Sequence, residues 1–382
     1  MFNLILLFVI SSTQKYSYMY KLFSLLCFIF LLSKSAESQN LDSTKVISFE
    51  QQFSDSIAII NQQNEDLKES RDAYNDGLIL LKNKNYNEAI IFFSRAISID
   101  SIFFQAYLSR AKCYENSDFN LAISDYLKTF ELDSTNLLAL YAVANLYLKT
   151  NKYLAEEMYK TIFSLNIYEY KALNQLGIIA FTDEKYDDAE QLFTQSLLIN
   201  RNSYTLNDRG SCYRKLDKLD LAVNDYLAAI ALNTNLAFIY SNLGSVYAKQ
   251  DEVEKAIIYY DLAISIDANY ILAYNNKASV LLDENKFEKA KVEIDKALAL
   301  DAEYAPAYNN TGVINHKLKK YNEAISAFDK AIKLDVNYAK AYLNRGISKQ
   351  MIRNEEGACL DWSKAKELGI MMAKKYLSND CE

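Results

Sequence analysis

The stretch AYNNTGVINHKLKKYNEAISAFDKAIKLD, residues 307–335, predicts two helices joined by a short polar turn. Its second part places small and apolar residues at i, i+1, i+4, i+7 and i+8, one face of an α-helix: Ala324, Ile325, Phe328, Ala331 and Ile332. Before the turn, Tyr308 and Gly312 lie four residues apart and mark another helix face. Small residues let two helix axes approach closely, and an aromatic ring fills the space beside them. The stretch therefore predicts an antiparallel helix pair with an apolar face that the pair cannot bury alone.

The same pattern recurs nine times along the chain. A small residue, which we call the anchor, returns every 33 or 34 residues: Gly77, Ala111, Ala144, Gly177, Gly210, Gly244, Ala278, Gly312 and Gly346. Alanine follows each anchor after 11 or 12 residues, and the position four residues beyond it is aromatic in every unit except at Ile294. Aspartate or asparagine, which suits a turn, follows the second helix in the first eight units. Stacking such pairs buries their apolar faces, so the sequence predicts a solenoid.

This skeleton of small residue, alanine and aromatic residue resembles the tetratricopeptide repeat, a helix–turn–helix unit of about 34 residues. The resemblance covers residues 70–372. It implies an all-α fold, a right-handed superhelical solenoid of about nine repeats. The proline that usually follows the second helix of this family is absent, and Pro306 lies at the start of a helix, where proline is tolerated. Each of the three 33-residue steps removes one turn residue.

Both ends of the repeat region need a cover. Residues 39–69 show little periodicity and much Gln, Asn and Ser, so we expect a loose linker that leads into a short helix, an N-terminal cap. Gly369 is a helix C-cap signal. The residues after it predict a C-terminal capping helix, with the cap at 373–382, because a solenoid must close its last apolar face.

Residues 1–38 have the features of a secretory signal peptide. The apolar run at 22–32 follows Lys21 and precedes small and polar residues, the order of such a peptide. The run is too short to span a bilayer. Met19 would begin a signal peptide of ordinary length, and Gln39 would be the first mature residue. We therefore expect a secreted or periplasmic protein; a membrane anchor left uncleaved is the alternative.

Cys359 and Cys381 are candidates for a disulfide. Cys359 lies near the start of the last repeat's second helix, and Cys381 follows the capping helix. If the two helices fold back antiparallel, the cysteines lie ~14 and ~16 Å from the shared turn at 1.5 Å per residue, and so at the same level. Two unrelated thiols are the alternative, which a cytosolic location would favour. Cys113 and Cys212 are interpreted as small packing residues.

Neither composition nor motifs indicate catalysis. The formal net charge of −7 would repel a phosphate backbone, so we expect no nucleic-acid partner. The sequence has one histidine, His316, and none of the usual nucleophile, metal or nucleotide motifs. We interpret His316 as a surface residue. We expect a chain that is not an enzyme and uses no cofactor and no metal.

Asparagine recurs two residues before the anchor in four consecutive repeats: Asn242, Asn276, Asn310 and Asn344. An amide both donates and accepts, so it can pair with the backbone of an extended peptide whatever the peptide's side chains. The series is similar to the asparagine ladder in the repeat domain of O-linked N-acetylglucosamine transferases. A structural role, in which each amide bonds a neighbouring helix, is the alternative.

Lysine recurs five residues after the anchor, as at Lys249 and Lys317. It could hold an acidic peptide. Its place in the last turn of the first helix, where a cation is favourable against the helix dipole, is the interpretation we favour.

The family resemblance implies a function in protein binding. First helices line the concave groove in which partners of this family lie. We therefore expect a non-catalytic scaffold that binds a peptide segment or a protein partner there. Two alternatives stay open: a regulatory or substrate-docking subunit of an enzyme complex whose catalytic chain is separate, and a membrane-tethered assembly scaffold.

Overall fold

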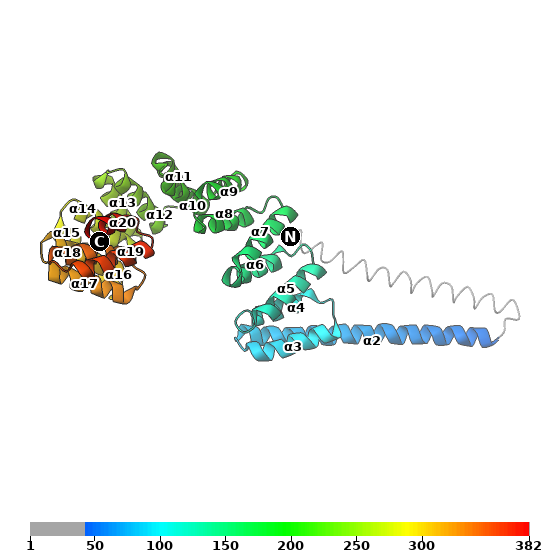
Figure 1. Cartoon of the computed structure of the whole chain (residues 1–382). Helices are drawn as coiled ribbons and strands as arrows, with labels where there is room; N and C mark the ends of the chain where they lie inside the picture. Colours follow the sequence, from blue (N-terminus) through cyan, green and yellow to red (C-terminus); the bar gives the residue numbers. More distant parts are fainter. Residues whose placement is uncertain (1–42, 382) are drawn as a thin grey trace. The chain divides into compact units, whose positions relative to one another are not determined.

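The computed structural model describes residues 43–381, in which helices follow one another without a strand (Figure 1). The first helices of the repeats are α2 (Ser43–Lys82), α4 (Phe104–Tyr114), α6 (Leu137–Thr150), α8 (Tyr170–Thr182), α10 (Ser203–Lys215), α12 (Ala237–Lys249), α14 (Ile271–Asp283), α16 (Ala305–Lys317) and α18 (Ala339–Met351). The second helices are α3 (Tyr86–Ile99), α5 (Phe119–Leu132), α7 (Lys152–Leu165), α9 (Tyr186–Ile199), α11 (Leu219–Leu232), α13 (Val253–Ile266), α15 (Phe287–Leu300), α17 (Tyr321–Leu334) and α19 (Glu355–Glu367). Helix α20 (Ala373–Asp380) closes the series.

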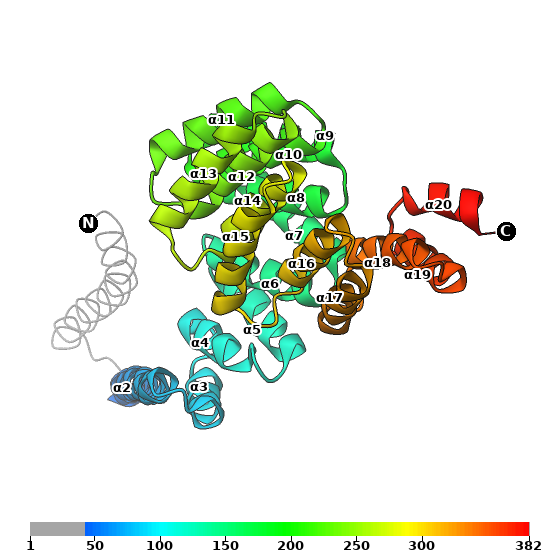
Figure 2. The same ribbon diagram turned by 90° about the vertical axis from the view of Figure 1, so that its left-hand side faces the viewer.

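The chain forms two compact units that divide between Ala139 and Leu140. Within the second unit, each first helix from α8 to α16 contacts the first helix of the next repeat as well as its own second helix. The first helices therefore form one layer and the second helices the other, an alternation that can be followed in Figure 2. The expected all-α solenoid of helix pairs is confirmed.

The anchor is small because an aromatic ring lies directly against it. A Cβ atom added at Gly177 would lie 2.6 Å from the ring of Phe193, sixteen residues later. Phe193 is fully buried, so the ring has little room to move away. One repeat has no aromatic residue at this position. Its second helix has Ile294 there, and its anchor is Ala278 instead of glycine. The pairing of small anchor with large second-helix residue thus sets how closely the two helices pack.

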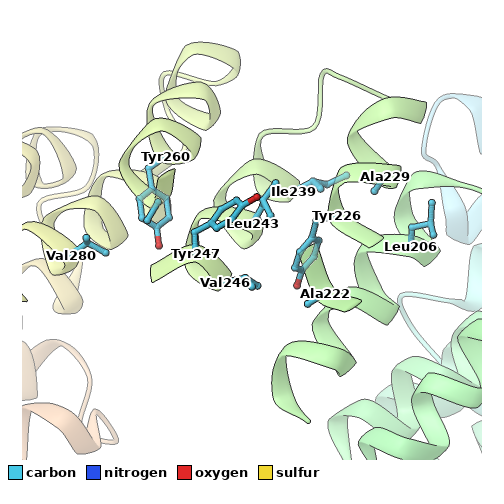
Figure 3. Close-up of a cluster of buried hydrophobic side chains, with 11 residues drawn as sticks. Leu206, Ala222, Tyr226, Ala229, Ile239, Leu243, Val246, Tyr247, Tyr260 and Val280 are labelled. Atoms are coloured by element: carbon cyan, nitrogen blue, oxygen red, sulfur yellow. The ribbon is translucent and has the colours of Figure 1, made fainter. Parts of the chain in front are cut away.

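The buried aromatic residues also join one repeat to the next. In the second unit, Tyr226 and Tyr260 belong to a single cluster with Leu243 and Val246 of α12 (Figure 3). Tyr226 and Leu243 are fully buried. Burying a side chain of this size contributes about 2 kcal/mol relative to leaving it exposed. The stack is therefore stabilised across repeat boundaries as well as within each pair.

The turns between first and second helices come in two forms. In seven repeats a non-glycine residue seven positions after the anchor has positive φ: Lys84, Glu184, Asp217, Asp251, Asn285, Lys319 and Arg353. The repeats anchored at Ala111 and Ala144 lack one turn residue, and there Asp118 and Asn151 cap the second helix with their side chains. The third short step lies after α9, where Asn202 caps α10. The 33-residue steps thus remove turn residues, as expected.

Residues 43–69 are not the loose linker that we expected. They belong to α2, a continuous helix of 40 residues that runs on through the first anchor. The stretch 43–76 contains neither glycine nor proline, and a helix that is held by packing at one end gains a hydrogen bond for each residue added. Propagation, rather than an apolar periodicity of the whole segment, accounts for the helix. The signal-peptide prediction for 1–38 lies outside the described residues.

Helix α20 covers the last repeat, and the expected capping helix is confirmed. Ala373 is fully buried, and the ring of Tyr376 stacks on Trp362 with the ring centroids 4.9 Å apart. Gly369, which ends α19, has φ +95°, a conformation that glycine adopts without strain. Among the described residues, no helix has both the length and the apolar character needed to cross a lipid bilayer.

Candidate partner-binding face

Three of the four asparagines bond the preceding repeat. The Nδ2 groups of Asn242, Asn310 and Asn344 donate to side-chain oxygens 35 positions earlier, at 2.8, 2.9 and 3.0 Å. The acceptors are Asn207, Asn275 and Asn309. Each acceptor lies three residues before the preceding anchor, on the neighbouring first helix. The sequence left open whether these amides bind a peptide or bond a neighbouring helix. In these three residues the amide bonds a neighbouring helix.

Asn310 is the most enclosed member of the series. The residue is only 8% exposed. In addition to its bond to Asn275, its Oδ1 accepts a long hydrogen bond of 3.4 Å from Asn309. Its amide is therefore used inside the repeat stack.

Asn276 differs from the other three. It is half-buried, and its amide makes no hydrogen bond with any residue that the structure describes. The position that supplies the acceptor in the other repeats is Ser241, which is buried and has a shorter side chain. Asn276 therefore keeps a donor and an acceptor that no described residue uses, in the middle of the first-helix layer.

In α10, Asp208 lies two residues before the anchor, the position that asparagine occupies in four later first helices. It accepts a hydrogen bond of 3.1 Å from Asn207, and burial raises the pKa of its carboxyl group. An ionised carboxylate cannot donate a hydrogen bond. Correspondingly, Oδ1 of Asn174, at the acceptor position of α8, is buried without a partner among the described residues. The ladder is thus interrupted between α8 and α10.

An apolar column runs beside the amides. Six residues before the anchor, four consecutive repeats have Tyr204, Phe238, Leu272 and Pro306. Tyr204 is 58% and Leu272 44% exposed, and the rings of Tyr204 and Phe238 stack across repeats with centroids 6.0 Å apart. Leu272 precedes Asn276 by four residues, so the two share a face of α14. We call Tyr204, Phe238, Leu272 and Asn276 the first-helix face.

The two candidate lysines lie opposite acidic groups. Both occupy the last turn of a first helix, Lys249 in α12 and Lys317 in α16. Nζ of Lys249 is 2.7 Å from the carboxylate of Asp217, in the turn of the preceding repeat. Lys317 is exposed, and its charge opposes the increase that burial causes in the pKa of Asp283. The arrangement supports links between helix ends more than it supports a site for an acidic peptide.

His316 is not the surface residue that we expected. It is half-buried at the end of α16, and its Nδ1 lies 2.9 Å from the hydroxyl of Ser348 in the next repeat. Burial lowers the pKa of the imidazole. Its partner is 32 residues away in the sequence, so only the stacking of repeats reveals the contact.

Sequence reasoning missed a second polar series, in the core. In four repeats a cation immediately before the anchor pairs with a buried acid on the second helix: Arg110–Asp125, Arg209–Asp225, Lys277–Glu293 and Arg345–Asp361. Each cation also bonds a polar residue on the second helix of the preceding repeat, namely Ser94, Thr194, Asp261 and Asp329. The available signal was a cation followed by an acid after 15 or 16 residues. Through these second bonds the cations join consecutive repeats.

The cysteines have two environments. Cys359 and Cys381 form a disulfide that ties the chain end to α19, with their Cα atoms 5.7 Å apart. Cys113 and Cys212 are buried free thiols, and burial raises the pKa of Cys113 to about 11 and that of Cys212 to about 12. Thiols with such pKa values are poor nucleophiles. The described residues contain no group of three or more His, Cys, Asp or Glu side chains suited to a metal ion.

Comparison with known proteins identifies the repeats. Sequence patterns of the tetratricopeptide repeat match residues 73–103, 239–270, 271–304 and 305–338, and one described as a TPR repeat matches 210–251. No curated protein matches the sequence.

Two of the many solved structures that match the chain illustrate the shared fold. One, a tetratricopeptide repeat protein from Parabacteroides merdae, has a TM-score of 0.57 at 19% identity, over 64% of this chain and 98% of that one. The other, from the APC/C hetero-tetramer Cut9–Hcn1, has a TM-score of 0.52 at 14% identity, over 81% of this chain and 76% of that one.

The matched ranges fall on the repeats that the anchors delimit, and the structural neighbours have the same fold. Repeats of this kind are typical of non-catalytic scaffolds that bind other proteins. The recognition made from the sequence is confirmed: the chain is a tetratricopeptide repeat protein.

Proposed function

We propose that the chain is a protein-binding scaffold whose first-helix face holds an extended peptide segment of a partner. The observation that carries this proposal is Asn276, an amide without a protein partner inside a layer whose other ladder amides are engaged. Neither amide atom of Asn276 is buried without a partner, so both are accessible to a ligand. A peptide backbone offers the matching donor and acceptor.

The apolar column supplies the rest of the contact. Tyr204, Phe238 and Leu272 expose apolar surface along three consecutive first helices. Aromatic and leucine side chains beside a specific polar group are the usual makeup of a peptide-binding surface. The partner segment would therefore pair its backbone with Asn276 and rest apolar side chains on the column.

We also propose that the mature chain begins near Gln39 and works outside the cytoplasm. The disulfide between Cys359 and Cys381 supports an oxidising compartment. N-terminal sequencing of the chain from its native host tests the processing, and peptide mapping without reductant tests the bond. A mature chain that retains residues 1–38 would favour the membrane-tethered scaffold instead.

The binding face is tested with peptides selected on the immobilised protein from a random library. Because one hydrogen bond contributes about 1 kcal/mol, Asn276→Ala should weaken the selected peptide about fivefold. Leu272→Ala should weaken it by a similar factor.

Leu198→Ala is the matched control, because Leu198 is 83% exposed but lies on α9, in the second-helix layer. Selected peptides that bind the Asn276 and Leu272 variants as tightly as the wild type would contradict the proposal. The identity of the natural protein that carries a matching segment separates a general scaffold from a docking subunit of an enzyme complex.

A further inference from the structure

Arg214, in the last turn of α10, is a half-buried cation without an acidic partner. The other half-buried arginines each bond a carboxylate of the second helix, namely Arg110, Arg209 and Arg345. Among the described residues no carboxylate lies within ion-pair distance of Arg214, and its Nε is buried without a hydrogen-bond partner. A cation that is partly removed from water is stabilised by an anion beside it. The guanidinium therefore keeps a charge that no described acid neutralises.

The acids on either side of Arg214 in the sequence are engaged with other residues. Asp208 accepts a hydrogen bond of 3.1 Å from Asn207. Asp217 lies 2.7 Å from Nζ of Lys249, and the same Nζ donates to the backbone oxygen of Arg214 at 3.4 Å. A second cation thus lies beside the last turn of α10, and neither acid pairs with the guanidinium.

Hydroxyl groups from two consecutive repeats lie near the guanidinium. The charge of Arg214 opposes the increase that burial causes in the pKa of Tyr226 and of Tyr260. The hydroxyl group of Tyr226 is 3.0 Å from that of Ser211, and Tyr260 donates to Oγ of Ser245 at 3.2 Å. Figure 3 shows the hydroxyl groups of both tyrosines pointing to the same side of the cluster. The surroundings of the guanidinium are therefore polar but uncharged, at the boundary between the repeats of α10 and α12.

Arg214 shares a face of α10 with Tyr204, which belongs to the first-helix face. Four residues of α10 are spaced as i, i+3, i+7 and i+10, the spacing of one helix face: Tyr204, Asn207, Ser211 and Arg214. Asn276 lies on α14, two first helices away, which is about 20 Å at ~10 Å between neighbouring helices. An extended peptide covers that distance with about six or seven residues at ~3.3 Å each. One short segment can therefore reach both Asn276 and Arg214.

We propose that Arg214 binds a carboxylate group of the peptide segment that the first-helix face holds. The inference rests on the proposed function and names the chemistry of the partner: an Asp or Glu side chain, or the carboxylate at the end of the segment. A guanidinium suits a carboxylate because two of its N–H groups can donate in parallel to the two oxygens. Of the nitrogens of Arg214, Nε alone is buried without a partner, so the carboxylate would approach the Nη groups.

The test is a double-variant cycle with peptides selected on the immobilised protein from a random library. Arg214→Gln should weaken a selected peptide about tenfold, because hydrogen bonds between charged groups contribute more than neutral ones. Replacing an Asp or Glu that the selected peptides share by its amide should weaken binding to the wild type by the same factor and leave binding to Arg214→Gln unchanged. If amidation of the peptide's C-terminus has this effect instead, the terminal carboxylate is the bound group.

Arg353→Gln is the matched control, because it removes the same charge from an exposed turn between α18 and α19. It should leave the affinity for the selected peptide unchanged within about twofold. Circular dichroism should show both variants folded like the wild type. A loss of affinity in Arg353→Gln equal to that in Arg214→Gln would mean that net charge is responsible, and would overturn the proposal.

The result also separates this site from the proposed function. Selected peptides whose binding needs no carboxylate, or an Arg214→Gln variant that binds them like the wild type, would overturn the carboxylate site. If Asn276→Ala still weakens those peptides, the peptide-binding face stands and the carboxylate site alone fails. If Asn276→Ala, Leu272→Ala and Arg214→Gln all bind like the wild type, the proposed function fails together with the site.

Discussion

The fourth repeat (α8 and α9) and the fifth (α10 and α11) have helices of equal length and the same glycine anchor, yet they fill one buried position in opposite ways. Before the anchor the fourth has Leu176 and the fifth has Arg209. At the related position of the second helix, the fourth has Leu192 and the fifth has Asp225, whose carboxylate lies 2.7 Å from Arg209. The same backbone thus accepts an apolar pair or an ion pair.

The difference teaches what the ion pair adds. Burying two charges costs desolvation that their attraction roughly offsets, so the pair adds little net stability compared with two leucines. Arg209 also donates a hydrogen bond of 3.1 Å to Thr194, on the second helix of the fourth repeat. Two leucines have no group that could make this directional bond. The charged version therefore fixes how consecutive repeats are oriented, and the apolar version contributes packing alone.

The largest effect is expected from breaking the ion pair on one side. Asp225→Ala leaves the guanidinium of Arg209 half-buried without its carboxylate, and we expect a loss of about 3 kcal/mol in the free energy of unfolding. Urea denaturation measures it. The double variant Arg209→Leu/Asp225→Leu copies the fourth repeat and should lie within about 1 kcal/mol of the wild type. A double variant as unstable as the single one would show that the two repeats are not interchangeable at this position.

The anchors of the two repeats should differ in their tolerance of a methyl group. A Cβ at Gly177 would lie 2.6 Å from the buried ring of Phe193, whereas a Cβ at Gly210 would lie 3.1 Å from Tyr226. We expect Gly177→Ala to destabilise the chain by about 2 kcal/mol, because the ring must shift. Gly210→Ala should change stability by less than about 1 kcal/mol, because the helix preference of alanine offsets the closer contact. Thermal unfolding of the two variants side by side decides this, and equal losses would contradict it.

The amide ladder is interrupted between the fourth and fifth repeats but continuous where Asn310 meets Asn275. Asn310→Ala removes a buried donor and leaves the amide oxygen of Asn275 unpaired, which should cost about 1.5 kcal/mol. Asn276→Ala removes an amide without a protein partner and should leave stability unchanged within about 0.5 kcal/mol. Equal losses in chemical denaturation would mean that Asn276 also has a structural role.

Repairing the interruption should give the smallest effect, a gain of about 1 kcal/mol in stability. Asp208→Asn replaces a desolvated carboxylate by an amide that can donate to the unpaired oxygen of Asn174. The raised pKa of Asp208 means that the folded chain holds this proton at a pH where the unfolded chain has released it, so wild-type stability falls as the pH rises through that window. The gain should therefore be complete at neutral pH and shrink as the pH falls through the folded pKa. A gain independent of pH would exclude the carboxylate as its cause.

Much of the fold could be predicted because the residues that pack against each other within a repeat lie close together in the sequence. The anchor at Gly177 and the ring at Phe193 are sixteen residues apart, close enough for helical periodicity to pair them in the sequence. The capping helix followed from Gly369 for the same reason, since a helix end is a local signal. The N-terminal helix could not be predicted in this way, because propagation from a packed end leaves no periodic mark.

The candidate site was predicted only in part. The column that contains Asn242 and Asn276 was visible, but its two interpretations could not be separated. Whether such an amide is free depends on the residue 35 positions earlier. That residue is Asn207 for Asn242 and Ser241 for Asn276. His316 was misjudged for the same reason, because its partner Ser348 lies in another repeat.

The sequence by itself determined the helix pairs, their number and the small anchors, because periodicity and side-chain size act within one repeat. The tertiary structure alone decided which polar groups are engaged: Asn310 is enclosed, Asn276 keeps its amide free, and Arg209 reaches back to Thr194. The physical reason is that hydrogen bonds between repeats require neighbouring helices in a definite register. Stacking fixes that register, and no single repeat contains it.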